Sequence, residues 1–236
     1  MKIKILYLYP DLMNLYGSSG NIRCLERHIE AAGGEVEVAH ATVGDEIDFS
    51  DVDFVYMGAG TERSRLRALS DLLNHREKLE SYLNDGGLAL FCGNSFEILG
   101  KKIKTFAGEN IECLNFFDFE TFEEKRRVVV DTICDCRFVD GEIIGFMNKQ
   151  SRTSIVATPF FRVVKGAGNA PDRNDEGIAS GGLFASSLSG PILVRNPHLR
   201  VFLEKKIYEK KGLSLSPVSF ANEERAYEES LAGLKK

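Results

Sequence analysis

Residues 85–100 read Asp85-Gly-Gly-Leu-Ala-Leu-Phe-Cys92-Gly-Asn-Ser-Phe-Glu-Ile-Leu-Gly100, the pattern of a buried strand that turns sharply into a helix with a thiol at the corner. Short apolar runs bounded by glycine are typical of strands inside a parallel sheet. A strand-to-helix corner is also where several hydrolases hold their nucleophile. The residues alone leave two assignments open. Either Cys92 stands at the apex of the corner, or Cys92 ends the strand and Gly93 stands at the apex.

Alternating strands and helices lead up to this corner. Residues 2–8 predict an apolar strand that Tyr9-Pro10-Asp11 ends. Residues 53–57 predict a second buried strand, which delivers Gly58-Ala59-Gly60 at its carboxyl end before Thr61 caps a helix. The other elements predicted here are a helix from 17–21 to about Ala32, a strand over 35–40 and a leucine-striped helix over 66–83. This β-α-β-α-β order predicts a parallel sheet with right-handed crossovers.

Shorter strands and few helices follow the corner. The best strand candidates are residues 127–134 and 142–146, with a turn near Asp140-Gly141 between them. Residues 169–182 are rich in Asp, Asn and Gly, which predicts a polar loop. Residues 183–191 predict a strand that leads into a turn.

The end of the sequence predicts two helices. Residues 197–211 form the first, which ends at Gly212. The second lies in the last residues of the chain, where a modest apolar stripe caps the domain or docks a partner. We expect one α/β domain over residues 1–212 and a C-terminal helical tail over residues 213–236.

Composition and charge argue against several classes of protein. The chain has 236 residues, of which 43% are hydrophobic and 28% charged, an ordinary balance for a folded globular protein. Its formal charge of −5 gives no electrostatic reason to expect nucleic-acid binding, which needs a basic surface. No apolar run approaches the roughly 20 residues of a membrane-spanning helix. The first residues enter a strand and lack the apolar core of a signal peptide, so we expect the protein to stay in the cytoplasm.

The cysteines favour reduced thiols. Cys24, Cys92, Cys113, Cys134 and Cys136 are odd in number and irregularly spaced, unlike the paired framework of small secreted proteins. The pair Cys134-Asp-Cys136 lacks the second ligand pair that a structural zinc site needs. Because both side chains share one face of an alternating strand, we interpret them as packing residues. We expect neither a metal nor a cofactor.

Motifs spread over nearly the whole chain resemble a known family. In chain order they are Leu8–Gly17 with Gly20-Asn21, Met57–Arg63, Asp85–Lys102, Gly145–Asn148 with Arg152-Thr153, and Leu188–Leu193. Together they resemble the class I (triad-type) glutamine amidotransferases of the cobyric acid synthase-like branch, and most of all the glutaminase subunits of bacterial lipid II isoglutaminyl synthases. The resemblance implies an α/β, flavodoxin-like, three-layer fold with a mostly parallel central sheet.

The chemistry of that family needs a cysteine thiolate on a nucleophile elbow, a histidine that activates it, and backbone N–H donors for the oxyanion. The family's elbow resembles Asp-Gly-x-x-x-Leu-x-x-Cys-Gly-Gly-Tyr-Gln-x-Leu-Gly, and without gaps it places the nucleophile position at Gly93. Cys92 then falls on the preceding aliphatic position. The family's histidine segment resembles Tyr-Leu-His-Gly-Pro, which corresponds here to residues 187–191 and places Ser189 at the histidine position.

The resemblance also implies a substrate-binding region, to which we assign Gly58, Gly60, Gly93, Asn94, Arg127 and Asn148. Gly58 and Gly60 match the oxyanion-hole loop, although a tight strand-to-helix turn needs such glycines as well. Arg127, or its neighbour Arg126, corresponds to a substrate-positioning arginine, with a solvated charge as the alternative interpretation. Asn148 lies in a segment similar to Gly-Phe-Glu-Asn-His-x-x-Arg-Thr, in which Met147 and Lys149 replace the acid and the histidine.

None of the histidines is a convincing replacement for the base; they are His28, His40, His75 and His198. His198 comes nearest, but it starts a helix, and we interpret it as an exposed residue beside the cap. A thiol without a nearby base keeps a pKa of about 8.5, or higher when buried, and stays mostly protonated at neutral pH. We therefore interpret Cys92 as a small buried hydrophobe, while it remains the candidate catalytic residue of any surviving hydrolysis.

We expect a glutamine amidotransferase-like subunit that has lost glutamine hydrolysis, and whether it is an enzyme stays open. In the complexes that it resembles, this subunit supplies ammonia from glutamine to a Mur ligase-like, ATP-dependent partner that amidates the lipid II stem peptide in peptidoglycan biosynthesis. Two alternative hypotheses remain. In the first, Cys92 is the nucleophile of a working glutaminase. In the second, the chain is a small-molecule-binding or regulatory protein without a ligase partner. Glutamine or a related small molecule is the expected ligand.

Overall fold

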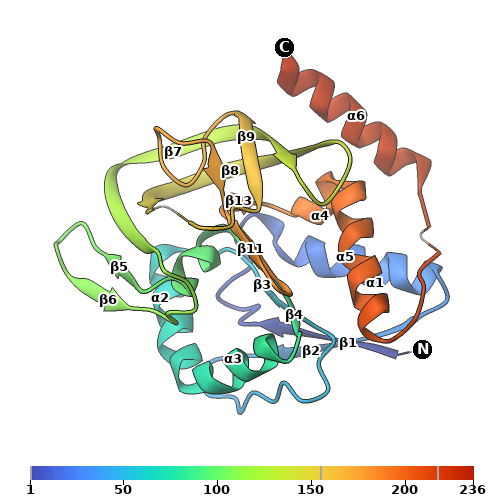
Figure 1. Cartoon of the computed structure of the whole chain (residues 1–236), viewed down its shortest axis with the longest axis horizontal. Helices are drawn as coiled ribbons and strands as arrows, with labels where there is room; N and C mark the ends of the chain where they lie inside the picture. Colours follow the sequence, from blue (N-terminus) through green and yellow to red (C-terminus); the bar gives the residue numbers. More distant parts are fainter. Residues whose placement is uncertain (1, 155, 217) are drawn as a thin grey trace.

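A mostly parallel sheet forms the centre of the protein in the computed structural model, which describes residues 2–154, 156–216 and 218–236 (Figure 1). Its strands are β1 (Lys2–Leu8), β2 (Glu35–Ala41), β3 (Phe54–Met57), β4 (Leu88–Cys92), β11 (Ile178–Ser180) and β12 (Leu183–Ser186). They lie in the order β11-β12-β4-β3-β1-β2, and every pair except β11–β12 is parallel. Apart from the antiparallel edge strand β11, this is the 2-1-3-4-5 strand order of flavodoxin-like folds. The predicted fold class is confirmed.

Side chains of the central strands alternate between two apolar cores, one on each face of the sheet. On β1, Ile3 and Ile5 enter one core, while Leu6 and Leu8 enter the other. The first core is covered by α1 (Ser19–Ala31), α4 (Ile192–Arg195) and α5 (Pro197–Lys210), and the second by α2 (Glu62–Leu72) and α3 (Arg76–Asn84), which the 3₁₀ helix η2 (Leu73–His75) joins. The helices and the sheet thus form the three layers of an α/β fold.

A second, mostly antiparallel sheet is built around the long hairpin of β7 (Glu120–Cys136) and β8 (Glu142–Thr153). Its shorter strands are β5 (Lys102–Lys104), β6 (Asn110–Glu112), β9 (Phe161–Lys165), β10 (Asp175–Glu176) and β13 (Leu188–Ser189). The register of the hairpin shifts between Glu123 and Val128, as at a β-bulge. Bulges turn side chains away from the regular alternation. Arg127 lies in this irregular segment of β7.

Two predicted segments differ from the structure. The strands predicted at residues 127–134 and 142–146 are parts of the longer β7 and β8. The polar loop predicted at residues 169–182 is wrong in part, because β10 and β11 form within it. The buried carboxylate of Glu176 accepts hydrogen bonds from Ser186 Oγ at 2.8 Å and from Ser187 N at 2.7 Å. Ser186 and Ser187 lie 10 and 11 residues after Glu176, outside the predicted loop. The composition of residues 169–182 alone could not indicate that these groups would bury the Glu176 carboxylate.

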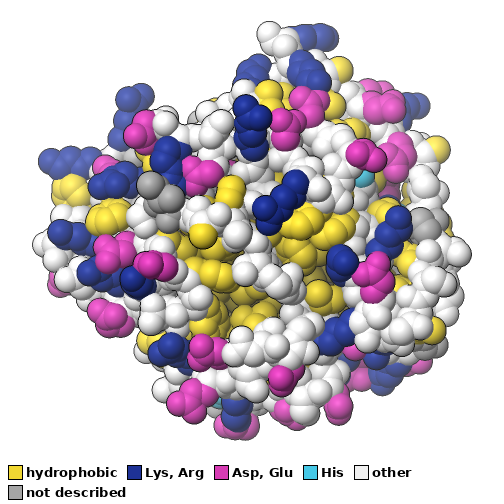
Figure 2. All heavy atoms as spheres, viewed as in Figure 1, with side chains coloured by type: hydrophobic (Ala, Val, Ile, Leu, Met, Phe, Trp, Pro, Cys, Tyr) yellow, Lys and Arg dark blue, Asp and Glu magenta, His cyan; other side chains and the backbone are white. Residues whose placement is uncertain are grey.

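The predicted C-terminal helix is present as α6 (Ala221–Lys235), which Figure 1 shows in red at the periphery of the molecule. Its first turn contacts α1, because Glu223 Oε2 lies 2.8 Å from Nε2 of the buried His28. Further along, the Tyr227 hydroxyl donates a hydrogen bond to the carbonyl oxygen of Glu142 at 2.7 Å. Lys235 of α6 also pairs with Glu142. No residue of α6 is buried, and charged side chains gather on the helix where it projects from the rest of the molecule (Figure 2).

The cysteines are free thiols, and Cys134 and Cys136 lie in the apolar core, as the alternation of their strand predicts. Within the described ranges, no group of three or more His, Cys, Asp or Glu side chains is arranged to hold a metal ion. Across those same ranges, no helix combines the length and the apolar character that crossing a bilayer requires.

Candidate functional site

The strand-to-helix corner has Gly93 at its apex. Cys92 ends β4 with the extended backbone of a strand (φ −118°, ψ 146°), whereas Gly93 has a φ of +66° and begins the 3₁₀ helix η3 (Gly93–Leu99). A positive φ of this size favours glycine, because a Cβ atom is strained there. Ser95 fixes the corner to the sheet, since its hydroxyl contacts the carbonyl oxygens of Cys92 at 2.8 Å and Met57 at 3.1 Å. In the folded chain, Gly93 rather than Cys92 therefore occupies the corner.

The Cα–Cβ direction at Gly93 points toward the position predicted to replace the histidine. A Cβ atom added to Gly93 would lie 3.1 Å from Ser189 Oγ. The same atom would lie 2.5 Å from the Cβ of Ala59, which is closer than real Cβ atoms approach. Positions 93 and 189 thus face each other across the corner, and Ala59 occupies the space that a side chain on residue 93 would need.

Cys92 lies inside the protein and away from this apex. Its side chain is 0% exposed and packs in the apolar core beneath α1, α4 and α5. Burial raises the pKa of the thiol far above its ordinary value, and the nearby charge of Glu176 raises it further. Only a thiolate is an effective nucleophile. The neutral thiol of Cys92 is thus suited to packing rather than to attack.

The loop Gly58-Ala59-Gly60 lies against the N-terminal loop so closely that two of its residues must be glycine. A Cβ atom on Gly58 would lie 2.3 Å from the carbonyl oxygen of Met13, and one on Gly60 would lie 2.7 Å from that of Leu12. Protein groups already accept the hydrogen bonds of this loop. Ala59 N donates to Ser18 Oγ at 3.1 Å, and Gly60 N donates to Oδ1 of Asn94 at 2.9 Å.

A cavity of about 390 Å³ opens beside the corner. Its walls come from the N-terminal loop, the loop after β3, the first turn of α2, η3, the β7–β8 hairpin and β13. The lining residues include Tyr16, Gly60, Glu62, Arg65, Asn94, Glu97, Glu123, Arg127, Asn148, Lys149, Gln150, Ser151 and Ser189. Carboxylates and cations both line it, with polar amide and hydroxyl groups between them. Cavities of this size that carry a few convergent polar groups are typical small-molecule sites.

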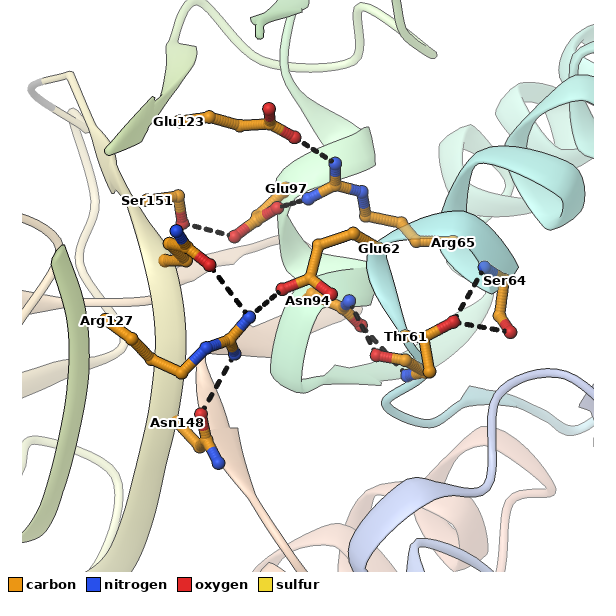
Figure 3. A network of polar contacts seen from close by, with 12 residues as sticks. Thr61, Glu62, Ser64, Arg65, Asn94, Glu97, Glu123, Arg127, Asn148 and Ser151 are labelled. Atoms are coloured by element: carbon orange, nitrogen blue, oxygen red, sulfur yellow. Dashed lines mark hydrogen bonds and ion pairs between the residues drawn. The ribbon is translucent and has the colours of Figure 1, made fainter. Parts of the chain in front are cut away.

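A buried ion-pair network forms one wall of the cavity (Figure 3). Arg65 of α2 contacts the Glu97 carboxylate of η3 and lies 3.1 Å from Oε1 of Glu123 on β7. The Ser151 hydroxyl on β8 donates a hydrogen bond to the second Glu97 oxygen. The side chains of Arg65 and Glu97 are only 2% and 4% exposed. Each buried charge has therefore lost its contact with water and is stabilised by the opposite charge of its partner. The network joins α2, η3, β7 and β8 at the base of the site.

A second, more exposed network crosses the cavity rim (Figure 3). The Arg127 guanidinium donates to Oε1 of Glu62 at 2.5 Å and to the side-chain oxygens of Asn148 and Gln150 at 3.0 Å each. Asn148 in turn donates from Nδ2 to the Tyr16 hydroxyl at 2.7 Å. These contacts connect α2, the β7–β8 hairpin and the 3₁₀ helix η1 (Leu15–Gly17).

Lys149 is a second buried cation of the cavity, in addition to Arg65. Its ammonium group donates to the carbonyl oxygens of Gly168 at 2.7 Å and Asn169 at 3.1 Å. Burial lowers the pKa of Lys149, although the nearby carboxylates of Glu176 and Glu97 act in the opposite direction. The lysine that replaces a family histidine in the sequence motif is therefore held by backbone oxygens.

The structure brings together most of the residues that the sequence assigned to the site. Gly60, Asn94, Arg127, Asn148 and Ser189 line one cavity. Gly58 and Gly93 lie in the backbone turns that support it, while Cys92 is not among the lining residues.

The expectation that His198 is exposed is wrong. Its ring is half-buried and packs edge-on against the Tyr227 ring of α6, with the centroids 4.9 Å apart. Burial lowers the pKa of His198. The tail covers this histidine, a contact between distant segments that helix-cap patterns cannot indicate. His198 is also not among the residues that line the cavity.

Sequence reasoning missed the buried network of Arg65, Glu97 and Ser151. One signal was present, because Glu97 interrupts the apolar run Phe96–Leu99 and a buried carboxylate needs a cationic partner. A second signal was Lys149 and Ser151 on the buried face of β8, where apolar residues are expected. Neither signal identifies Arg65 as the partner, because that contact spans 32 residues.

Comparison with known proteins agrees with this architecture. The model of the CobB/CobQ-like glutamine amidotransferase domain matches residues 4–197. The GatD subunit of the lipid II isoglutaminyl synthase (glutamine-hydrolyzing) of Staphylococcus aureus is 29% identical over 94% of this chain and 91% of its own length. The subunit of the same name from Streptococcus pneumoniae is 31% identical over 89% of this chain and 82% of its own length.

Solved structures agree in fold. A crystal structure of a glutamine amidotransferase superimposes with a TM-score of 0.58 at 12% identity, over 86% of this chain and 98% of that one. The family match covers most of the chain, and the family that the sequence motifs indicate is confirmed. The chain belongs to the CobB/CobQ-like glutamine amidotransferase family.

Proposed function

We propose that this chain is a glutamine amidotransferase-like subunit of a lipid II isoglutaminyl synthase-type complex and that it has lost glutamine hydrolysis. Its family and its two GatD relatives support the type of complex. The observation that carries the loss is the pairing of Gly93 with Ser189: the apex has no side chain, and the residue that faces it is not a base.

Hydrolysis of a carboxamide through a covalent intermediate needs a nucleophile at the apex and a proton acceptor within hydrogen-bond reach of it. Gly93 supplies no nucleophile. The hydroxyl of Ser189 is not a proton acceptor of useful strength at neutral pH. Cys92 is fully buried, and its raised pKa keeps the thiol protonated. The nucleophile and the proton acceptor are thus missing independently, so restoring one of them would leave the other missing.

The remaining role is to bind a partner and a small molecule. The partner that the family resemblance implies is a Mur ligase-like, ATP-dependent subunit. The names of the two relatives, each a subunit of a lipid II isoglutaminyl synthase, support a partner of this complex. The small molecule is glutamine or a related amino acid. The cavity supports this ligand class, because Arg127 and Asn148 offer charge and hydrogen bonds beside an amide-lined loop.

Affinity labelling of the purified complex with its ligase tests this proposal. A glutamine analogue that alkylates catalytic thiols is incubated with the complex, and each cysteine is examined by mass spectrometry. We expect a stable complex with the ligase and no adduct on Cys92, with Cys92→Ser as the matched control for assigning peptides. An adduct on Cys92 of the wild-type protein would support the alternative of a working glutaminase. A chain that fails to bind the ligase would contradict the assignment to the complex.

A further inference from the structure

Two side chains of the cavity wall carry the same functional groups as a glutamine-like ligand. Glu62 presents a carboxylate, and Asn94 presents a primary carboxamide. Each is bound to a group that the proposed function would offer to a ligand. Glu62 contacts the guanidinium of Arg127 (Figure 3), and Asn94 is hydrogen-bonded to the backbone of Gly60. The two contacts come from different elements, because Glu62 begins α2 and Asn94 lies in η3.

The Arg127 contact lies at the solvent-exposed rim of the cavity. Oε1 of Glu62 accepts from Nη2 of Arg127 at 2.5 Å, and the two side chains are 46% and 39% exposed. Partial burial works against ionisation of Glu62, yet the hydrogen bond from Arg127 gives the carboxyl group a lowered pKa. Gln150 and Asn148 accept further hydrogen bonds from the same guanidinium. An incoming carboxylate must therefore replace protein oxygens, and Glu62 is the charged one among these three acceptors.

The Gly60 contact is a closed pair of hydrogen bonds. Oδ1 of Asn94 accepts from Gly60 N at 2.9 Å, and Nδ2 of Asn94 donates to the Gly60 carbonyl oxygen at 2.8 Å. A ligand with a primary amide would make the same two bonds with this backbone unit, because its carbonyl accepts and its NH₂ group donates. The Asn94 side chain is only partly buried, and both Asn94 and Gly60 line the cavity.

We propose that the cavity is self-occupied: Glu62 and Asn94 fill the carboxylate and carboxamide positions, and an amino acid that carries both groups binds only by displacing them. The inference rests on the proposed function, which assigns this cavity to glutamine or a related amino acid. Glu62 and Asn94 are therefore specificity-determining residues. Their side chains compete with such a ligand for Arg127 and Gly60 and thereby lower its affinity.

Calorimetric titration with L-glutamine tests the inference on the full chain in complex with its ligase. An exposed ion pair contributes little, so Glu62→Ala is expected to tighten binding by about threefold. Removing the paired hydrogen bonds with Asn94→Ala is expected to tighten it by about tenfold. The double variant is expected to gain about thirtyfold, since the two contacts share no partner. Glu37→Ala is the matched control, because it removes an ion pair with Lys2 of similar exposure on the edge strand β2 and is expected to leave affinity unchanged.

Thermal melting of each variant shows that the chain is folded before titration. If either alanine variant unfolds, Glu62→Gln carries the test, because it keeps the shape of the side chain and removes the charge that competes for Arg127. Equal affinity in the wild-type protein and in the folded variants would overturn self-occupancy, as would the absence of binding in all of them. Glutamine hydrolysis by the wild-type protein would contradict the proposed function instead, and that readout is independent of these affinities.

Discussion

A Cβ atom on Gly93 would lie 2.5 Å from the Cβ of Ala59. The apex of the strand-to-helix corner therefore lacks a nucleophile and is also packed against the neighbouring loop. A side chain at residue 93 would have to displace Ala59 while holding a φ of +66°. The short distance to Ala59 and the positive φ both disfavour any residue larger than glycine at position 93. The corner is thus a tight packing contact between η3 and the loop after β3.

Substitution of Gly93 measures this contact. We expect Gly93→Ala to lower the free energy of unfolding by about 2–4 kcal/mol, because backbone strain at positive φ and overpacking each cost on the order of 1–3 kcal/mol. Urea denaturation followed by circular dichroism gives the value.

A double-mutant cycle with Ala59→Gly isolates the steric part. We expect the loss of unfolding free energy caused by Gly93→Ala to be at least about 1 kcal/mol smaller when residue 59 is glycine. Independent sites deviate from additivity by no more than about 0.5 kcal/mol. Additive effects would show that Ala59 does not restrict the apex.

Thiol reactivity separates a packing cysteine from a nucleophile. Cys92 is fully buried, and burial raises its pKa far above the ordinary value. Because alkylation needs an accessible thiolate, we expect Cys92 to remain unmodified by iodoacetamide in the folded protein and to react fully in urea. Peptide mass spectrometry gives the modified fraction, with Cys92→Ser as the control. Rapid modification in the folded protein would contradict the packing role.

The stability of the chain is expected to depend on pH through Glu204 of α5. Burial raises the pKa of this carboxyl group from 4.5 to about 7, although the charge of Arg200 acts in the opposite direction. The folded chain then binds a proton more tightly than the unfolded chain, so this group's contribution to the free energy of unfolding decreases as pH rises from about 4.5 to about 7 and is constant above that. Other ionisable groups near Glu204 and Arg200 are Cys24, His28, Tyr208 and Glu223.

Glu204→Gln tests this pH dependence, because glutamine keeps the shape of the neutral carboxyl group. We expect the wild-type protein to lose on the order of 2–3 kcal/mol more than the variant between pH 5 and pH 8. Chemical denaturation at several pH values provides the comparison. Parallel pH profiles for the two proteins would show that Glu204 does not titrate in this range.

The buried network of the cavity wall predicts a large effect for Arg65. Arg65→Met leaves the Glu97 carboxylate buried without its cation, which costs about 3–5 kcal/mol of stability. Arg67→Met on the exposed face of the same helix is the matched control and is expected to change stability by less than about 0.5 kcal/mol. Urea denaturation gives the free energy of unfolding of each variant. Equal and small losses for the two variants would show that the Arg65–Glu97 pair does not stabilise the folded chain.

The sequence was sufficient for the central sheet and for the apex. Alternating apolar residues such as Ile3 and Ile5 predict β1, and the motif from Asp85 to Gly100 fixes the register that puts Gly93 at the corner. Gly93 has a positive φ, which is the backbone conformation of a nucleophile elbow. Glycine adopts this conformation without the strain that a side chain would cause.

The cavity walls were beyond sequence reasoning because their contacts are long-range. Arg127 was assigned to the site by resemblance, but its bond to Glu62 spans 65 residues. The Asn94–Gly60 pair spans 34 residues and involves backbone groups that have no sequence signature. Local patterns indicate which side chains are unusual, whereas tertiary packing decides which of them meet.

Steady-state glutamine hydrolysis by the purified complex with its ligase is the most direct test of the loss of catalysis. Ammonia release is compared between the wild-type chain and Cys92→Ala under identical conditions. Because Gly93 and Ser189 provide neither nucleophile nor base, we expect both proteins to release ammonia at the rate of the protein-free control. Hydrolysis by the wild-type chain that Cys92→Ala abolishes would contradict this account and identify Cys92 as the nucleophile.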